Sequence, residues 1–304
     1  MNPRNFTGYG RNPPRVKWPG DARIAISVVV NYEEGSEYST LDGDETHEVN
    51  NEVPSPVPVS QRDLANESFF EYGSRVGVWR LMSILDDFSI SASFFCCALA
   101  LERNPEVGRE IVRRGHEVVG HGYRWEEYYL MDIESEREAI HRTIESLERT
   151  TGVKPVGWYT RYAPSENTRK LVASNGEFIY DSNSYGDDIP YYETVEGEPW
   201  LVVPYSLEVN DTRFWRGGMN RPSDFLETLT NTFDLLYEEG LENPKIMNVG
   251  LHCRIAGRPS RASVLKQFLA YVDDKPNVWF ARRDEIARWW LENYPAVPQQ
   301  STSP

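Results

Sequence analysis

Arg23-Ile-Ala-Ile-Ser-Val-Val-Val-Asn-Tyr-Glu-Glu-Gly35 joins a nearly continuous apolar run to two adjacent carboxylates. An apolar run of this length is typical of a strand covered on both faces, so we expect a buried strand at 24–31. Glu33 and Glu34 then follow the C-terminal end of the strand, where adjacent acids are costly to bury unless they are used. In α/β barrels the chemistry takes place at that end of the strands. The alternative is a strand followed by a solvated acidic loop.

Short apolar runs alternate with helical patterns along the rest of the chain. This alternation indicates an α/β protein with a mostly parallel sheet, for which we expect a (β/α) barrel, with a doubly wound sheet as the alternative. No Gly-x-Gly-x-x-Gly follows a predicted strand, and no phosphate-binding loop is present. The predicted strands are 24–31, 91–97, 117–120, 155–159, 178–181, 200–204, 246–251 and 278–281. The predicted helices are 73–88, 105–114, 133–151, 166–174, 223–239, 261–272 and 284–292.

The pattern predicts one catalytic domain over residues 1–304, with an N-terminal extension of about 20 residues and a flexible tail at 295–304. The clearest helix follows Asp132, a predicted N-cap, and ends before Gly152. The segment 42–63 is acidic and aperiodic, so we expect a long loop of functional importance.

Composition limits the partners and the compartment. The chain has 32 basic and 47 acidic residues, a formal charge of −15, which argues against nucleic acid or an anionic membrane surface as a partner. No run of about 18 apolar residues is present, so we expect no transmembrane helix. The first residues lack the apolar core of a signal peptide, so we expect a cytoplasmic protein. The three cysteines are an odd number, which does not suggest disulfides; Cys96 and Cys97 are expected to be buried thiols, and Cys253, next to His252, could line a site.

Two of the five histidines follow predicted strands. His121 comes after the strand at 117–120, with a glycine on each side, and His252 comes after the strand at 246–251. If these strand ends converge with the end that carries Glu33 and Glu34, the four side chains form an active site.

These residues resemble a known family. Tyr32-Glu-Glu-Gly35, His121-Gly-Tyr-Arg-Trp125, Arg161 with Pro164, and Leu251-His252 are similar to the motifs of the polysaccharide deacetylase (NodB-like) superfamily, and most similar to its allantoinase branch. The resemblance runs almost from end to end of the chain. Further matching stretches are Gly8-Tyr-Gly-Arg-Asn-Pro-Pro14, Trp18-Pro-Gly-Asp-Ala-Arg-Ile24, Glu71-Tyr-Gly-Ser-Arg75, Val156-Gly-Trp-Tyr-Thr160, Gly250-Leu-His-Cys-Arg254 and Trp279-Phe-Ala-Arg-Arg283.

The resemblance implies a deformed (β/α) barrel that hydrolyses C–N bonds of amides. In the superfamily's metal-dependent members an Asp and two His, spaced His-x-x-x-His, bind a divalent ion. Here Glu33 and Glu34 stand in place of two Asp, and Trp125 stands in place of the second His. An indole cannot ligate, so the departure predicts a site without a metal or other cofactor, although residual zinc binding stays open.

The resemblance also supplies roles for the candidate residues. Glu33 or Glu34 is the candidate general base and His252 the general acid, and His121 or Arg161 would stabilise the oxyanion. The candidate substrate contacts are Trp125, Tyr159, Arg161 and Asp211, and Asp211 could instead orient a histidine.

The function expected from the resemblance is hydrolytic opening of a small cyclic amide, most simply allantoin to allantoate in purine catabolism, by a homotetramer. The alternatives are a metal-dependent cyclic imide hydrolase, a polysaccharide N-deacetylase, and a binding module without activity. The segments 159–169 and 215–219 depart from the allantoinase pattern, so another cyclic amide or imide also stays open.

Overall fold

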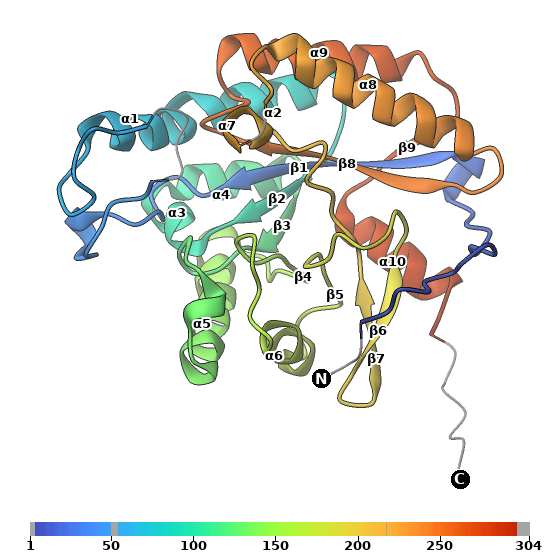
Figure 1. The fold of residues 1–304 in the computed structure, drawn as a ribbon, viewed down its shortest axis with the longest axis horizontal. Coiled ribbons are helices and arrows are strands. Elements are labelled where there is room, and N and C mark those ends of the chain that lie inside the picture. The colour runs from blue at the N-terminus through green and yellow to red at the C-terminus, as the bar shows by residue number, and fades with distance from the viewer. Residues whose placement is uncertain (1–3, 50–53, 217, 297–304) are drawn as a thin grey trace.

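The computed structural model describes residues 4–49, 54–216 and 218–296, and a curled, mostly parallel sheet lies at its centre (Figure 1). The strand order is β6-β7-β5-β4-β3-β2-β1-β8, and β9 also pairs with β1. Only β6 and β7 are antiparallel to each other. The strands are β1 (Ile24–Tyr32), β2 (Ser93–Cys96), β3 (Glu117–Gly120), β4 (Gly157–Trp158), β5 (Tyr180–Asp181), β6 (Tyr191–Val195), β7 (Glu198–Val202), β8 (Lys245–His252) and β9 (Val278–Phe280).

Strand β1 pairs with three other strands, and all of its residues are buried. It pairs with β8 along one side, and with β9 and then β2 along the other. A parallel bridge between Asn210 and Gly250 brings the chain after β7 beside β8. The sheet therefore curls into the deformed (β/α) barrel that the sequence predicted.

Helices cover both faces of the sheet (Figure 1). Helices α2, α3, α4, α8 and α9 share one core cluster with β1, and α5 contacts α3, α4 and α6, whereas α10 packs in another cluster with Ala25, which points to the opposite face of β1. The helices are α1 (Leu64–Tyr72), α2 (Val78–Asp87), α3 (Ala98–Arg103), α4 (Pro105–Arg113), α5 (Ile133–Thr151), α6 (Thr168–Asn175), α7 (Arg213–Arg216), α8 (Pro222–Glu239), α9 (Pro259–Asp273) and α10 (Arg283–Asn293).

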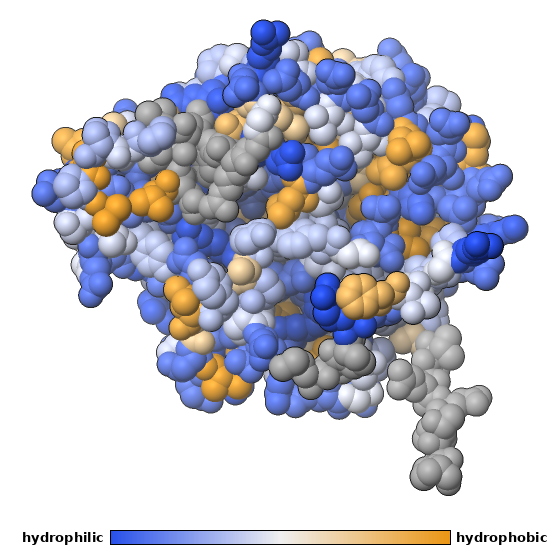
Figure 2. Space-filling model, in the orientation of Figure 1, coloured by the Kyte–Doolittle hydropathy of each residue, from blue (hydrophilic) through white to orange (hydrophobic). Residues whose placement is uncertain are grey.

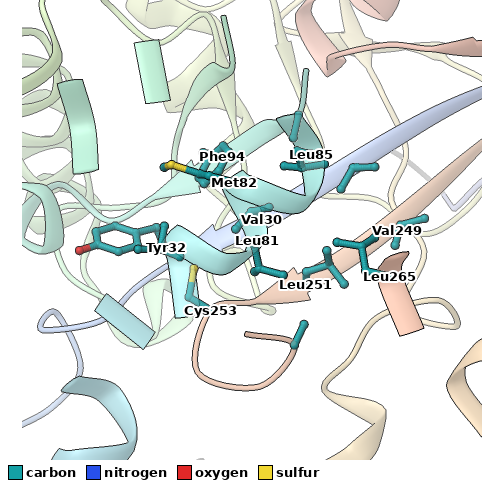
Figure 3. Packing of buried hydrophobic residues seen from close by; sticks show 14 of the residues in the cluster. Val30, Tyr32, Leu81, Met82, Leu85, Phe94, Val249, Leu251, Cys253 and Leu265 are labelled. Atoms are coloured by element: carbon teal, nitrogen blue, oxygen red, sulfur yellow. The ribbon is translucent and has the colours of Figure 1, made fainter. Parts of the chain in front are cut away.

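The main core lies between β1, β8 and the helices α2 and α9. Figure 3 shows Val30 of β1, Leu81 of α2 and Leu251 of β8 packed together, each fully or almost fully buried. Burying one such side chain stabilises a fold by about 1.5–3 kcal/mol. All three cysteines are buried and free, as predicted for Cys96 and Cys97, whereas Cys253 does not line the cleft described below.

Most predicted elements are present, and the differences have physical causes. Helix α5 has the predicted bounds, and Asp132 accepts from the backbone N–H groups of Glu134 and Ser135 as its N-cap. The helix predicted at 73–88 is a π-helical turn (Gly73–Gly77) followed by α2, and it continues the unpredicted helix α1 that precedes it. Strand β6 was not predicted because it lies at the sheet edge with no buried residue, and so lacks an apolar run. The helices α3 and α7, both short, were also not predicted.

The predicted long loop is present where the structure describes it. Apart from Asp42, the last residue of a 3-10 helix (Thr40–Asp42), the segment 42–63 has no helix or strand in its described part. Trp18 of the N-terminal extension packs against Trp279 and Trp290. Most of the predicted flexible tail, 295–304, lies outside the described residues.

Hydrophilic side chains dominate the face of the molecule seen in Figure 2, with apolar residues in small separate groups. Within the described residues, every helix is too short or too polar to cross a bilayer.

The π-helical turn brings its backbone unusually close to the loop after β8. A Cβ on Gly77 would overlap the carbonyl oxygen of Cys253, and a Cβ on Gly73 would overlap the carboxylate of Glu34. The two glycines therefore allow a close contact between this helix and residues next to His252 and Glu33.

We expect Gly77→Ala to lower the free energy of unfolding by about 1–3 kcal/mol, because the added methyl must displace backbone. Urea unfolding measures the effect. Gly186→Ala is the matched control, since a Cβ there has its nearest neighbour, Ser184 Oγ, at 3.4 Å. An unchanged or increased stability of Gly77→Ala would contradict the close contact.

Candidate active site

Three of the predicted residues meet at the C-terminal ends of the strands. Glu33 follows β1, His121 follows β3 and His252 ends β8. Oε1 of Glu33 lies 3.2 Å from Nε2 of His121 and 3.5 Å from Nε2 of His252. These three side chains line a cleft of about 600 Å³.

His252 is oriented by Asp211. Nδ1 of His252 lies 2.6 Å from Oδ1 of Asp211, while Oδ2 accepts from the backbone N–H groups of His252 and Ala256. A carboxylate can only accept, so Nδ1 carries a proton and Nε2 faces Glu33. Burial lowers the pKa of His252, but Glu33 and Asp211 outweigh it and raise the pKa to about 9. His252 is therefore an imidazolium at neutral pH.

His121 is held by the chain at Tyr159. Its Nδ1 lies 2.6 Å from the carbonyl oxygen of Tyr159, which can only accept, so this nitrogen also carries a proton. The imidazole stacks on the Tyr159 ring at 5.4 Å with an interplanar angle of 14°. Nε2 of His121 is thereby directed at Glu33.

Glu33 is a buried carboxylate surrounded by cations. Its Oε2 accepts from Nη1 of Arg254 at 2.7 Å. Burial alone would raise the pKa of Glu33, but Arg254, His252 and His121 hold it well below its ordinary value. Glu33 is therefore ionised at neutral pH, as a general base must be.

Glu34 lies behind the site. Its Oε1 accepts from the backbone N–H of Arg254 and its Oε2 from the backbone N–H of Glu33. It packs against Gly73 and is not among the residues that line the cleft. Burial, opposed in part by Arg254, raises the pKa of Glu34 above its ordinary value. The geometry thus distinguishes Glu33, which faces the cleft, from Glu34, which does not, whereas the sequence left both as candidates for the general base.

Trp125 and Arg161 form another part of the cleft wall. The Arg161 guanidinium lies 3.7 Å from the centroid of the Trp125 ring. It also contacts both carboxylate oxygens of Glu48, at 2.9 and 3.2 Å, and lies 3.2 Å from Glu127. A substrate would therefore share Arg161 with these carboxylates.

Of the other predicted contacts, Tyr159 lines the cleft, whereas Asp211 does not. Asp211 is fully buried against His252, which is the second of the two roles the sequence left open for it.

The donor set does not fit a metal ion. Both oxygens of Glu33 are engaged, one by Arg254 and the other by the histidines. A cation there would lie beside a guanidinium, and Trp125 offers no ligand atom. Within the described parts of the chain, no group of three His, Cys, Asp or Glu is arranged to hold a metal. The predicted lack of a cofactor itself stays a prediction.

The sequence did not point to Arg254, Glu48 or Glu127. Arg254 stands two residues after His252 in a stretch already quoted, so its spacing was a usable signal. Glu48 lies in the aperiodic loop, where no pattern shows which side chain folds back.

Comparison with known proteins agrees with this geometry. The family profile described as Polysaccharide deacetylase matches residues 67–178. A Schizosaccharomyces pombe protein whose name places it among the polysaccharide deacetylases is 37% identical, over 96% of this chain and 98% of that protein. The chain belongs to the polysaccharide deacetylase family of hydrolases, which act on C–N bonds.

Two solved structures are similar over almost the whole chain. A crystal structure from Pseudomonas aeruginosa PAO1, also named for the polysaccharide deacetylases, has a TM-score of 0.92 and 45% identity and covers 97% of this chain and 100% of that one. The crystal structure of PuuE allantoinase has a TM-score of 0.93 and 45% identity. The match covers 98% of this chain and 100% of the allantoinase chain.

The raised pKa of His252 predicts how stability depends on pH. The folded protein binds this proton more tightly than the unfolded chain, whose value is 6.5, so the stabilisation is complete below pH 6.5 and is lost as the pH rises through about 9. Relative to His252→Gln, we expect the wild-type free energy of unfolding to fall by about 3 kcal/mol over this range. Urea unfolding at both ends of the range measures it. A difference between the two proteins that does not vary with pH would contradict the assignment.

Proposed function

We propose that the protein is a metal-independent hydrolase that opens the ring of a small cyclic amide, with allantoin, hydrolysed to allantoate in purine catabolism, as the first candidate. The observation that carries the proposal is an ionised Glu33 that faces two histidines in a cleft with one carboxylate oxygen and pairs with the guanidinium of Arg254 through the other. The 45% identity to PuuE allantoinase over the whole chain supports the choice of substrate.

Glu33 is the general base in this proposal. A water bound at Oε1 loses a proton to the carboxylate as its oxygen attacks the ring carbonyl. His121, held at Nδ1 by the carbonyl oxygen of Tyr159, turns its Nε2 toward the same oxygen of Glu33 and so keeps this carboxylate in place.

His252 is the general acid. Its imidazolium gives the Nε2 proton to the ring nitrogen as the C–N bond breaks, and Asp211 keeps the ring in the orientation this requires. The positive charges of His252 and Arg161, which both line the cleft, stabilise the oxyanion of the tetrahedral intermediate.

The walls of the cleft suit a small flat ring. Trp125, Tyr129, Tyr159 and Tyr162 present aromatic surface, while the charged groups lie close to Glu33. On the resemblance alone we also propose a homotetramer, and we keep the cytoplasm as the proposed location.

The first test is hydrolysis of allantoin by the purified protein before and after exhaustive chelation. We expect equal turnover in both states, because no step uses a metal. Turnover that chelation abolishes and zinc restores would contradict the metal-independent mechanism. A folded protein that releases acetate from N-acetylated sugars and leaves allantoin intact would contradict the substrate class.

A second test separates the two acids. We expect Glu33→Gln to lower kcat by about 10²–10⁴-fold, because the general base is lost. Glu34→Gln should lower kcat much less, because Glu34 contacts backbone N–H groups behind the site. Circular dichroism checks that both variants fold. Normal turnover by the Glu33→Gln variant would show that Glu33 is not the general base.

A further inference from the structure

We propose that Arg254 is a positioning residue of this site, which fixes the Glu33 carboxylate so that Oε1 alone serves the histidines and the substrate. This inference rests on the proposed function. It gives the side chain of Arg254 the role of the positive charge that holds the Glu33 carboxylate in place. The contacts that carry it come from β8, the chain after β1, helix α1 and the loop after β3.

Arg254 binds both acids of the opening motif. Nη1 lies 2.7 Å from Oε2 of Glu33 and 3.6 Å from Oε1 of Glu34. The backbone N–H of Arg254 donates to the same oxygen of Glu34 at 3.0 Å. All three side chains are about 2% exposed or less. One residue thus ties two adjacent carboxylates together through its main chain and its side chain.

Aromatic rings fix the plane of this guanidinium. Its Cζ lies 4.6 Å from the centroid of the Phe70 ring and 4.9 Å from that of Trp125. Planar guanidinium groups stack on aromatic faces, whereas an ammonium is a point charge on a flexible stem. Trp125, which also contacts Arg161, therefore supports the arginine that orients Glu33.

The two oxygens of Glu33 are divided between two kinds of partner. Arg254 contacts Oε2, and His121 and His252 face Oε1. A rotation of the carboxylate that moved Oε1 away from the histidines would also move Oε2 away from Arg254. Arg254 is also absent from the residues that line the cleft, so it has no route to the substrate. Its removal should therefore lower kcat and leave KM nearly unchanged.

The experiment compares Arg254→Lys and Arg254→Gln with the wild type. We expect kcat to fall by about 10²-fold in Arg254→Gln, the loss typical of a misplaced catalytic group, with a smaller loss in Arg254→Lys and KM within about twofold. Arg258→Lys is the matched control, because Arg258 lies in the same loop but stacks on the rings of Tyr72, at 3.7 Å, and Phe69, at 5.2 Å. It should keep the wild-type kcat.

A double variant tests whether Arg254 acts through Glu33. In a Glu33→Gln background, Arg254→Gln should lower kcat no further, because the group it positions is already lost. Losses that multiply, or a raised KM with unchanged kcat in Arg254→Gln, would overturn the proposal. If Arg254→Gln does not fold, Phe70→Leu takes its place, since it keeps every charge but removes one ring face. It should lower kcat with KM unchanged, and full activity would contradict the proposal.

Crystal structures of the wild type and Arg254→Lys give a readout that needs no substrate. We expect Oε1 of Glu33 in the variant to move away from at least one of the two histidines. If the wild type opened no cyclic amide, the proposed function would fail, but this displacement would still support the role of Arg254. An unmoved Glu33 carboxylate would overturn that role whatever the substrate.

Discussion

The structure depends on a buried carboxylate held between cations. Glu33 follows the C-terminal end of the buried strand β1, where burial opposes its charge, and it stays ionised because Arg254 and His252 lie beside its two oxygens. An unpaired charge at this depth would cost several kcal/mol. The parallel sheet brings the strand ends together, and the cations make burial of the acid there tolerable.

The same constraint explains the long loop before α1. Glu48 in that loop holds Arg161 with both carboxylate oxygens, and its backbone carbonyl accepts from the side chain of Asn66. Arg161 in turn stacks on Trp125. The aperiodic segment therefore supports the cleft wall without lining the cleft, because its acid neutralises the buried cation of Arg161.

Sequence patterns could predict the barrel because apolar runs and helical periodicity are local. The strand at 24–32, the helix at 133–151, and the placement of His121 and His252 after strands all follow from such patterns. The choice between Glu33 and Glu34 could not follow, because adjacent side chains are distinguished only by what surrounds them. Arg161 and Glu48 are 113 positions apart in the sequence, and a contact between such distant residues cannot be predicted from local sequence patterns. Arg254 could have been predicted as a site residue, because it stands two residues after His252.

The most direct test of the central claim is a crystal structure of the Glu33→Gln variant with uncleaved cyclic amide, recorded with anomalous data at the zinc edge. The account predicts the ring in the cleft, its scissile carbonyl beside residue 33 and its ring nitrogen beside Nε2 of His252, with no anomalous peak near them. A metal peak between residue 33 and His121, or a substrate bound away from both histidines, would contradict it.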